Sequence, residues 1–430
     1  MTALPDMRGV SVVGTGLHRY QRGPDTSFVT LGTTATREAL TDAGLTWPDV
    51  QAAYVATSLL GMATGREIVR FLGATGLPVT QVENASASGS AAFRLAVLDV
   101  ASGLHDIAVA IGVDQPVPGR IASHHTGVPA HLDDLVAPFT HFALLLQAYL
   151  AKTGTTPEQV AAVAVKNHAN GALNPYAQRR KVRTLEEVMA PPQISGHLTR
   201  LQCTPVGEGA AAVIVAADSV LERMGIARRR SVRVRASAAQ SEVLNPTENV
   251  DVALTRTTTR EALEQSGVGP DELDVVEVHD AFSIEEILYA EAIGLSAEGE
   301  APHDLSRGDF AINGRVALSP SGGLLAMGHP IGPTGLGQVV ETTRQLRGEA
   351  GARQHDGARL GLTHMVGLGA VCLVHVLESG AEPEGRRPTG NPADRGRSPR
   401  RRAGADSPGR AADSPGRAVD APGQAAGCPP

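Results

Sequence analysis

The chain has 430 residues, of which 42% are hydrophobic and only 3% aromatic, so small side chains fill a core large enough for two domains or two fused half-domains. A formal charge of −7 gives no reason to expect nucleic-acid binding, and the longest apolar runs are too short for a membrane span. Cys203, Cys372 and Cys428 form no CxxC pair and no zinc pattern. Because no secretory signal is recognisable, we expect a cytoplasmic protein with reduced thiols and no metal.

Two segments far apart in the chain share one pattern, which indicates an internal duplication. Each contains Thr-Arg-Glu-Ala-Leu, then a glycine four residues later, a Pro-Asp turn and an apolar strand, and each follows another strand. The pattern predicts a strand, a helix ended by glycine and a second strand, a unit that favours a parallel sheet with right-handed crossovers. The two copies place the shared pentapeptide at 36–40 and 259–263, the strand before it at 9–13 and 231–234, and the strand after it at 50–55 and 273–278.

Other segments complete a predicted α/β fold of two similar halves. The N-terminal half covers residues 1–225 with an insertion at about 113–205, and the C-terminal half covers 226–379. An insertion in one half often covers a ligand site. We expect further helices at 88–102, 156–166 and 284–293, and strands at 107–112, 210–217, 361–366 and 371–377.

The last segment, residues 380–430, is rich in Pro, Gly and Arg and contains a tandem copy of ADSPGRA at 405–411 and 412–418. Such a composition buries too little apolar surface to offset its ordering entropy, so we expect disorder. The arginines at 400–402 could contact an acidic surface, and a solvated tail without function is the alternative.

The first of four loops that could carry chemistry is 82–90, which joins an apolar strand to a helix of small residues. Free N–H groups and the dipole at a helix start favour negative charge, which suits a nucleophilic hydroxyl or an oxyanion. Ser86 is therefore a candidate nucleophile. The alternative is that Ser86 or Ser88 only caps the helix.

The second loop, His-Asp-Ala-Phe-Ser at 279–283, directly follows the second-copy strand. Loops at the ends of parallel strands are where such folds place reactive groups. His279 and Asp280 could act as acid, base or hydrogen-bond donor. Alternatively, Asp280 or Ser283 caps the following helix, which leaves His279 unexplained.

The third and fourth loops are rich in glycine. In 322–335 five glycines flank His329, and no lysine follows, which excludes a GxxxxGK phosphate loop. We interpret His329 as a positioned base, with a solvated loop histidine as the alternative. In 363–370, which includes His364, Gly367 and Gly369 could present N–H groups to an oxyanion, or the segment is an ordinary tight hairpin.

Together the four loops, in this order over a duplicated body, resemble the thiolase superfamily, and most of all its sterol-carrier and lipid-transfer branch. The resemblance covers about residues 8–378 and includes the stretches 166–175 and 203–212. It implies a five-layered αβαβα fold with two stacked sheets and a homodimer. It also implies an acyl-CoA substrate, with coenzyme A as substrate or product and no separate cofactor.

The resemblance also implies roles for single residues. Ser86 takes the place of the family's acylated cysteine, and His329 matches the histidine that activates it. His279 matches the residue that helps to hold the thioester oxygen. The N–H of Ser86 and that of Gly367 or Gly369 would form a second oxyanion hole.

The sequence departs from the family at both reactive thiols. A cysteine beside His and a helix start can become a thiolate, whereas a serine needs a base during attack. The sequence offers Ser86 and His329 no obvious third member. The second family thiol is replaced by Ala281 or by the 363–369 segment, while Cys372 is more typical of a core. An acid/base role would then fall to the loop residues His279, Asp280 or His364.

Three functions fit these observations. The first is a thiolase-like acyltransferase with Ser86 as nucleophile, forming or cleaving C–C bonds in lipid or polyketide-type metabolism. The second is a retro-aldolase on β-hydroxyacyl-CoA that forms no acyl-enzyme and pairs with a small OB-fold partner, as the resemblance implies for relatives without the cysteine. The third is a non-catalytic subunit that binds CoA or lipid.

Overall fold

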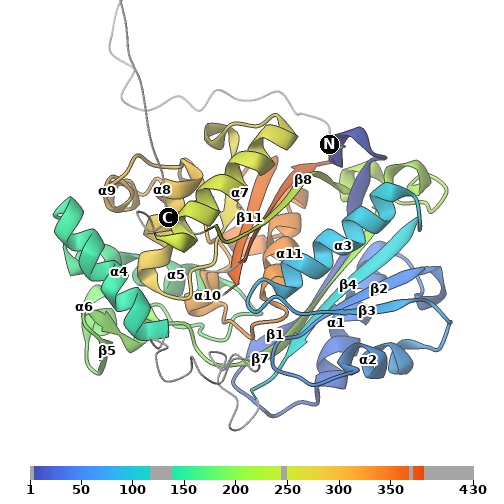
Figure 1. Cartoon of the computed structure of the whole chain (residues 1–430), viewed down its shortest axis with the longest axis horizontal. Helices are drawn as coiled ribbons and strands as arrows, with labels where there is room; N and C mark the ends of the chain where they lie inside the picture. The colour runs from blue at the N-terminus through green and yellow to red at the C-terminus, as the bar shows by residue number, and fades with distance from the viewer. Residues whose placement is uncertain (1–3, 117–137, 244–248, 368–370, 382–430) are drawn as a thin grey trace, which may run out of the picture. The chain divides into compact units, whose positions relative to one another are not determined.

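Ten strands form the centre of the protein, and hydrogen bonds join them in the order β10-β9-β11-β12-β8-β1-β7-β4-β2-β3 (Figure 1). The computed structural model describes residues 4–116, 138–243, 249–367 and 371–381. The strands are β1 (Val10–Gln21), β2 (Ala52–Ala56), β3 (Val79–Val82), β4 (Ile107–Asp114), β7 (Glu208–Ala217), β8 (Val232–Ser241), β9 (Val275–Glu277), β10 (Ala317–Leu318), β11 (Leu360–Gly367) and β12 (Val371–Ser379), and a separate pair consists of β5 (Gln193–Ser195) and β6 (Leu198–Thr199).

The strand order repeats itself, because β1-β7-β4-β2-β3 and β8-β12-β11-β9-β10 follow one plan. In each half the second strand, β7 or β12, runs antiparallel to its two neighbours, and the remaining pairs are parallel. The repeated unit favours parallel strands, and β7 and β12 are the strands that depart from this direction. The turn between β11 and β12 is too short for the crossover that parallel strands require.

Helices cover and separate the two half-sheets. They are α1 (Phe28–Ala43), α2 (Thr64–Leu72), α3 (Ser88–Ser102), α4 (Pro138–Thr153), α5 (Pro157–Leu173), α6 (Leu185–Met189), α7 (Val250–Ser266), α8 (Ser283–Ile293), α9 (Ala301–Arg307), α10 (Gly323–Ala326) and α11 (Thr334–Arg347). Helix α11 contacts β7 in one half and β11 in the other, and α3 packs beside it. With α1 on one outer face and α7 on the other, this is the five-layered α/β arrangement that the resemblance implies.

The two half-sheets are not separate, because β1 and β8 pair at Ser11–Arg233 and Val12–Val232. The stack is thus continuous at one edge. In the described parts of the chain, no helix combines the length and the apolarity that crossing a membrane requires.

The predicted duplication is confirmed in detail at α1 and α7. Ser27 caps the start of α1 and Asn249 caps the start of α7, each through a side-chain oxygen. Gly44 and Gly267 end the two helices with φ of 68° and 67°, a left-handed conformation that favours glycine. The sequence pattern therefore set both the helices and their ends.

The core is built from small side chains, as the composition predicts. Every residue of β7 is buried, and the two central helices meet at glycines. A Cβ atom at Gly89 in α3 would lie 2.7 Å from the carbonyl oxygen of Gly332. A Cβ atom at Gly335 in α11 would lie 2.3 Å from Ser90 Oγ. This close approach brings the N-terminal ends of α3 and α11 together.

Candidate active site

Ser86 and His329 meet where the central helices begin. Ser86 lies two residues before α3, and its Oγ is 3.0 Å from Nε2 of His329, which lies in the segment before α11. No side chain caps α3. The hydroxyl of Ser88 instead accepts from the Asn84 N–H and donates to the Ala85 carbonyl. The alternative that Ser86 or Ser88 only caps the helix was therefore wrong.

The turn before Ser86 is held in an uncommon conformation. Ala85 has a φ of 50°, in the left-handed region that alanine rarely adopts. The carbonyl of Ala85 accepts hydrogen bonds from the hydroxyls of Ser58 and Ser88, at 2.8 and 2.6 Å. These bonds offset the strain and hold Ser86 next to His329.

Thr334 supplies the third member that sequence reasoning missed. Its Oγ1 is 2.8 Å from Nδ1 of His329, on the ring nitrogen opposite Ser86. Burial, and then the nearby His279, lower the pKa of His329 well below its usual value, so the ring is neutral near pH 7. When Nδ1 carries the proton and donates to Thr334, Nε2 can accept the proton of Ser86. The only signal in the sequence was a hydroxyl five residues after the histidine.

His279 faces the same point with a free nitrogen. The ring centroids of His279 and His329 are 5.3 Å apart, nearly perpendicular. Nδ1 of His279 lies 2.9 Å from Glu285 Oε1, whereas its buried Nε2 has no partner among the described residues. Burial raises the pKa of Glu285, although His279 opposes this shift. Glu285 thus orients His279 and leaves Nε2 for a bound group, a contact that the sequence did not predict.

Asp280 is buried and supports the loops of the site. One carboxylate oxygen accepts the Leu324 N–H at the start of α10, and the other accepts Nδ2 of Asn167 from α5, each at 2.7 Å. Neither Asp280 nor Ser283 caps α8, because the Ser283 hydroxyl donates to Gln202. That predicted alternative was therefore wrong. The engaged oxygens favour a positioning role for Asp280 over the predicted substrate contact.

His364 is likewise engaged behind the site. Its Nε2 is 2.8 Å from Thr255 Oγ1, and its Nδ1 accepts the backbone N–H of His279 at 3.4 Å. Burial lowers the pKa of His364 to about 3, so the ring stays neutral. The geometry favours support of His279 over the predicted contact of His364 with substrate.

Gly367 lies against the Ser86 turn at the end of β11. A Cβ atom there would lie 2.4 Å from the Asn84 carbonyl oxygen, so only glycine fits without a shift. Strands β11 and β12 form the hairpin given as the alternative, with Gly367 opposite Val371. Gly369 lies outside the described residues, as do the predictions for the tail from residue 382 onward.

Asp114 at the end of β4 ties two loops together, and sequence reasoning missed it. It accepts the Ser58 N–H at 2.9 Å and the Gly332 N–H at 2.7 Å. Ser58 in turn contacts Ser88 in the nucleophile loop, and Gly332 follows His329. Burial raises the pKa of Asp114 to about 6, while its hydrogen bonds oppose the shift. The side chain therefore fixes the spacing between the two reactive loops.

Neither described cysteine resembles a reactive thiolate. Cys372 is fully buried in β12, as predicted for a core residue, and burial raises its pKa to about 12. Burial also raises the pKa of Cys203 to about 11. Within the described ranges, no cluster of His, Cys, Asp and Glu has the geometry of a metal site. The reactive side chains are thus a hydroxyl and two imidazoles.

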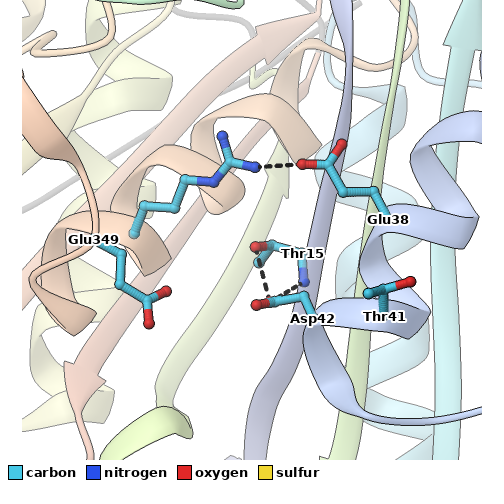
Figure 2. A pocket seen from close by; sticks show the side chains of 6 residues that line it. Thr15, Glu38, Thr41, Asp42 and Glu349 are labelled. Carbon is cyan, nitrogen blue, oxygen red and sulfur yellow. Dashed lines mark hydrogen bonds and ion pairs between the residues drawn. The ribbon is translucent and has the colours of Figure 1, made fainter.

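A polar pocket of about 450 Å³ lies between residues of β1, α1 and α11 and does not include Ser86 or His329 (Figure 2). Its carboxylates are paired: Glu38 with Arg344 at 3.0 Å, and Asp42 with Arg230 and Arg347 at 2.6 and 2.7 Å. Arg344 is near the C-terminal end of α11, whereas His329 precedes its N-terminal end. The ten residues from Thr334 to Arg344 span about 15 Å at 1.5 Å per residue, so this pocket is not the reactive site. The residues that line it are Thr15, Glu38, Thr41, Asp42, Arg344 and Glu349.

Both halves of the chain match known protein families. Residues 20–219 match the description "Thiolase, N-terminal domain", and residues 236–378 match "Thiolase C-terminal domain-like". Acetyl-CoA acetyltransferase of Methanothermobacter thermautotrophicus is 36% identical over 387 residues, covering 86% of this chain and 100% of that protein. Sterol carrier protein 2 of Gallus gallus is 34% identical over 395 residues, covering 87% of this chain and 72% of that protein.

Solved structures show the same fold. A structure named "Ltp2-ChsH2(DUF35) aldolase" superposes with a TM-score of 0.77 at 21% identity, covering 86% of this chain and 98% of that chain. The two domain matches, the identities and the shared fold agree with the resemblance carried by the four loops. The chain belongs to the thiolase family, on its sterol-carrier and lipid-transfer side.

Proposed function

We propose that this protein is a thiolase-type acyltransferase that acts on acyl-CoA thioesters and carries the acyl group on Ser86. The observation that carries the proposal is the 3.0 Å contact between Ser86 Oγ and His329 Nε2, with Thr334 on the far side of the imidazole. A hydroxyl, a neutral imidazole and an orienting group in line are the parts that nucleophilic catalysis by serine requires. The acetyltransferase relative supports the class of reaction.

The first step transfers the acyl group from sulfur to oxygen. His329 Nε2 accepts the Ser86 proton while Oγ bonds to the thioester carbon. We assign stabilisation of the oxyanion to the N–H of Ser86, near the start of α3, and to that of Gly367. The C–S bond then breaks, and the proton passes from His329 to the CoA sulfur.

His279 would serve the second half of the reaction. Its free Nε2 stands beside His329, and Glu285 fixes the ring from the other side. A carbonyl oxygen of the second substrate, held there, would gain negative charge as C–C bond formation or cleavage proceeds. Because both family thiols are absent, we expect slower turnover than a cysteine would allow.

A lyase is the second candidate, and one observation favours it specifically. A retro-aldol cleavage of a β-hydroxyacyl-CoA needs a base and an oxyanion hole but no acyl-enzyme, and the site holds two histidines without a reactive thiol. The structure named as an aldolase shares the fold of this chain, and it supports the lyase only through that shared fold. The name of that structure lists two components, Ltp2 and ChsH2(DUF35). This supports our proposal that the present chain has a small OB-fold partner. A homodimer remains a further proposal from family resemblance.

Release of CoA from a series of acyl-CoA esters tests these candidates. For an acyltransferase, Ser86→Ala abolishes CoA release and Ser86→Cys accelerates it, because a thiol ionises near the helix start. For a lyase, Ser86→Ala retains cleavage of a β-hydroxyacyl-CoA, whereas His329→Ala and His279→Ala lose it. That second ranking would overturn the proposal. Calorimetric binding of CoA esters without any turnover would leave a binding subunit.

A further inference from the structure

A small cavity is lined by Thr334, the residue that contacts the His329 imidazole. The lining residues that carry polar side chains are Tyr20, Glu277, Ser321, Thr334 and Gln338. Glycines at 323, 328 and 337 line it as well and leave the space open. Thr334 therefore borders both the cavity and, through its 2.8 Å contact, His329.

The size and chemistry of this cavity suit one water molecule. It offers about 10 Å³ to the centre of a water, close to what a single molecule needs when two or more polar groups surround it. Gln338 donates through Nε2 to the Val278 carbonyl at 2.9 Å, but its buried Oε1 has no partner among the described residues. A buried acceptor without a donor is rare in folded proteins, and a water would supply the donor.

Among the described residues that line this cavity, Glu277 is the one carboxylic acid, and it has no role in the proposed acyl transfer. Its side chain is buried, and its two oxygens accept the N–H and the hydroxyl of Ser321 at 2.9 and 2.7 Å. Burial and then the negative charge of Glu341 raise the pKa of Glu277 to about 8, although Ser321 and Lys166 oppose the shift. Near neutral pH the group can therefore hold or accept a proton. The titratable groups around it are Tyr20 on β1, Lys166 on α5, Asp280 after β9 and Glu341 on α11.

We infer that a water in this cavity connects Glu277 to Thr334, so that Glu277 exchanges protons with His329 while Ser86 reacts. The inference rests on the proposed function for its catalytic meaning. Its geometric basis is the shared cavity, the unpaired oxygen of Gln338 and the contact between Thr334 and His329.

The proton steps balance. As Ser86 gives its proton to Nε2, Nδ1 gives its proton to Thr334 Oγ1, the Thr334 hydroxyl proton passes to the water, and the water gives one to Glu277. One proton has moved from Ser86 to Glu277, and His329 remains neutral. This avoids a buried imidazolium at His329, which burial and the neighbouring His279 both disfavour. The steps reverse when Nε2 protonates the leaving CoA sulfur.

The test is a pH titration of ¹⁵N-labelled histidine rings by NMR, with the His329 signals identified by their loss in His329→Ala. In the wild type, the His329 nitrogens shift through a step near pH 8, where Glu277 ionises. Glu277→Gln removes that step and Thr334→Val removes or weakens it, while Thr334→Ser, which keeps the hydroxyl, retains it. Glu291→Gln is the matched control, because Glu291 is a half-buried glutamate of raised pKa that bonds instead to Tyr149 and Gly299.

A kinetic measurement separates the proton relay, by which Ser86 passes its proton through His329, Thr334 and the water to Glu277, from the proposed function. The rate of Ser86 acylation should rise about tenfold as pH increases through 8, and Glu277→Gln should make this profile flat. A shift of the His329 nitrogens near pH 8 without any acylation of Ser86 would support the relay and contradict the proposed function. Acylation with no His329 step near pH 8, or a step that survives Glu277→Gln, would overturn the relay. If Glu277→Gln fails to fold, the Thr334→Val and Thr334→Ser pair decides the question.

Discussion

The loops that lead into α3 and α11 occupy equivalent places in the two halves, yet they supply different chemistry. Both helices begin with a hydroxyl residue followed by glycine, Ser88-Gly89 and Thr334-Gly335, and they touch at these glycines. The Ser88 hydroxyl bonds to Asn84, Ala85 and Ser58, whereas the Thr334 hydroxyl contacts the reactive imidazole of His329. The hydroxyl at the equivalent position thus stabilises a turn in one half and orients a base in the other.

A duplicated fold forms this site by joining two loops that differ in sequence. The pseudo-symmetric contact of two helix starts brings the loops together, and the differences between the loops provide one nucleophile and one base. Asp114 bonds to both sides and fixes their distance. The duplicated fold sets the geometry of the site, and the residues that differ between the two loops set the reaction.

Removing the base should have the largest effect. We expect His329→Ala to lower the rate of CoA release by about 10³-fold, because general base catalysis contributes about 10²–10⁴. The exposed His303 in α9 gives a matched control, and His303→Ala should leave the rate unchanged. Equal rates for wild type and His329→Ala would remove the functional difference between the two loops.

Forcing the helices apart should come next. In Gly335→Ala the new methyl group would lie 2.3 Å from Ser90 Oγ and 2.7 Å from the Ser90 nitrogen, so α3 or α11 must move. We expect about a 10²-fold loss of acyl transfer and a loss of about 1–3 kcal/mol in the free energy of unfolding, measured by urea denaturation.

Gly61→Ala is the control for that substitution, because no atom lies within 4 Å of a Cβ atom there. It should change neither the rate nor the urea midpoint. If Gly335→Ala behaves like Gly61→Ala, the glycine contact does not set the spacing of Ser86 and His329.

His279 bonds to Glu285, whereas His329 bonds to Thr334, so Glu285→Gln tests the role of His279 alone. The substitution keeps the shape of the group at His279 but removes its charge. We expect C–C bond formation or cleavage to fall about tenfold while acylation of Ser86 continues. Product analysis beside mass spectrometry of the Ser86 peptide checks this, with Glu291→Gln as control. A parallel loss of both steps would show that His279 and His329 act as one unit.

Two further effects concern how the stability of the fold depends on pH. The folded pKa of Glu277 is about 8, against an ordinary value of 4.5, so the native state keeps a proton that the unfolded chain releases. Stability should therefore fall as pH rises from about 4.5 to 8, by about 2 kcal/mol between pH 6 and 8. Urea midpoints should show a flatter profile for Glu277→Gln, and identical profiles would contradict the raised pKa.

Acid should destabilise the fold for the opposite reason. Burial lowers the pKa of His364 and of His375 to about 3, so both stay neutral in the native state while the unfolded chain binds protons below pH 6.5. Stability due to these rings is present above pH 6.5 and is lost as pH falls toward 3. Urea midpoints between pH 4 and 7 measure this loss.

Much of the fold follows from local patterns. Helices α1 and α7, their glycine ends and the α3 boundaries were predictable because caps and periodicity act within a few residues. The antiparallel directions of β7 and β12 were missed because strand direction depends on connections that periodicity does not encode. The reactive side chains of Ser86 and His329 were predictable because they sit in loops beside the strand and helix signals.

The supporting contacts were beyond the sequence for a different reason. Asp114 bonds to Gly332 across 218 positions, and Asn167 bonds to Asp280 across 113. No local pattern links such residues. Thr334 lies near His329 in sequence, but only the turn between them decides that its hydroxyl meets Nδ1 and not solvent.

Mass spectrometry of the protein after brief incubation with an acyl-CoA and acid quench tests the central claim most directly. We predict that the peptide containing Ser86 gains the mass of one acyl group, and that Ser86→Ala gains none. A wild-type Ser86 peptide that stays unmodified while product accumulates would contradict the account.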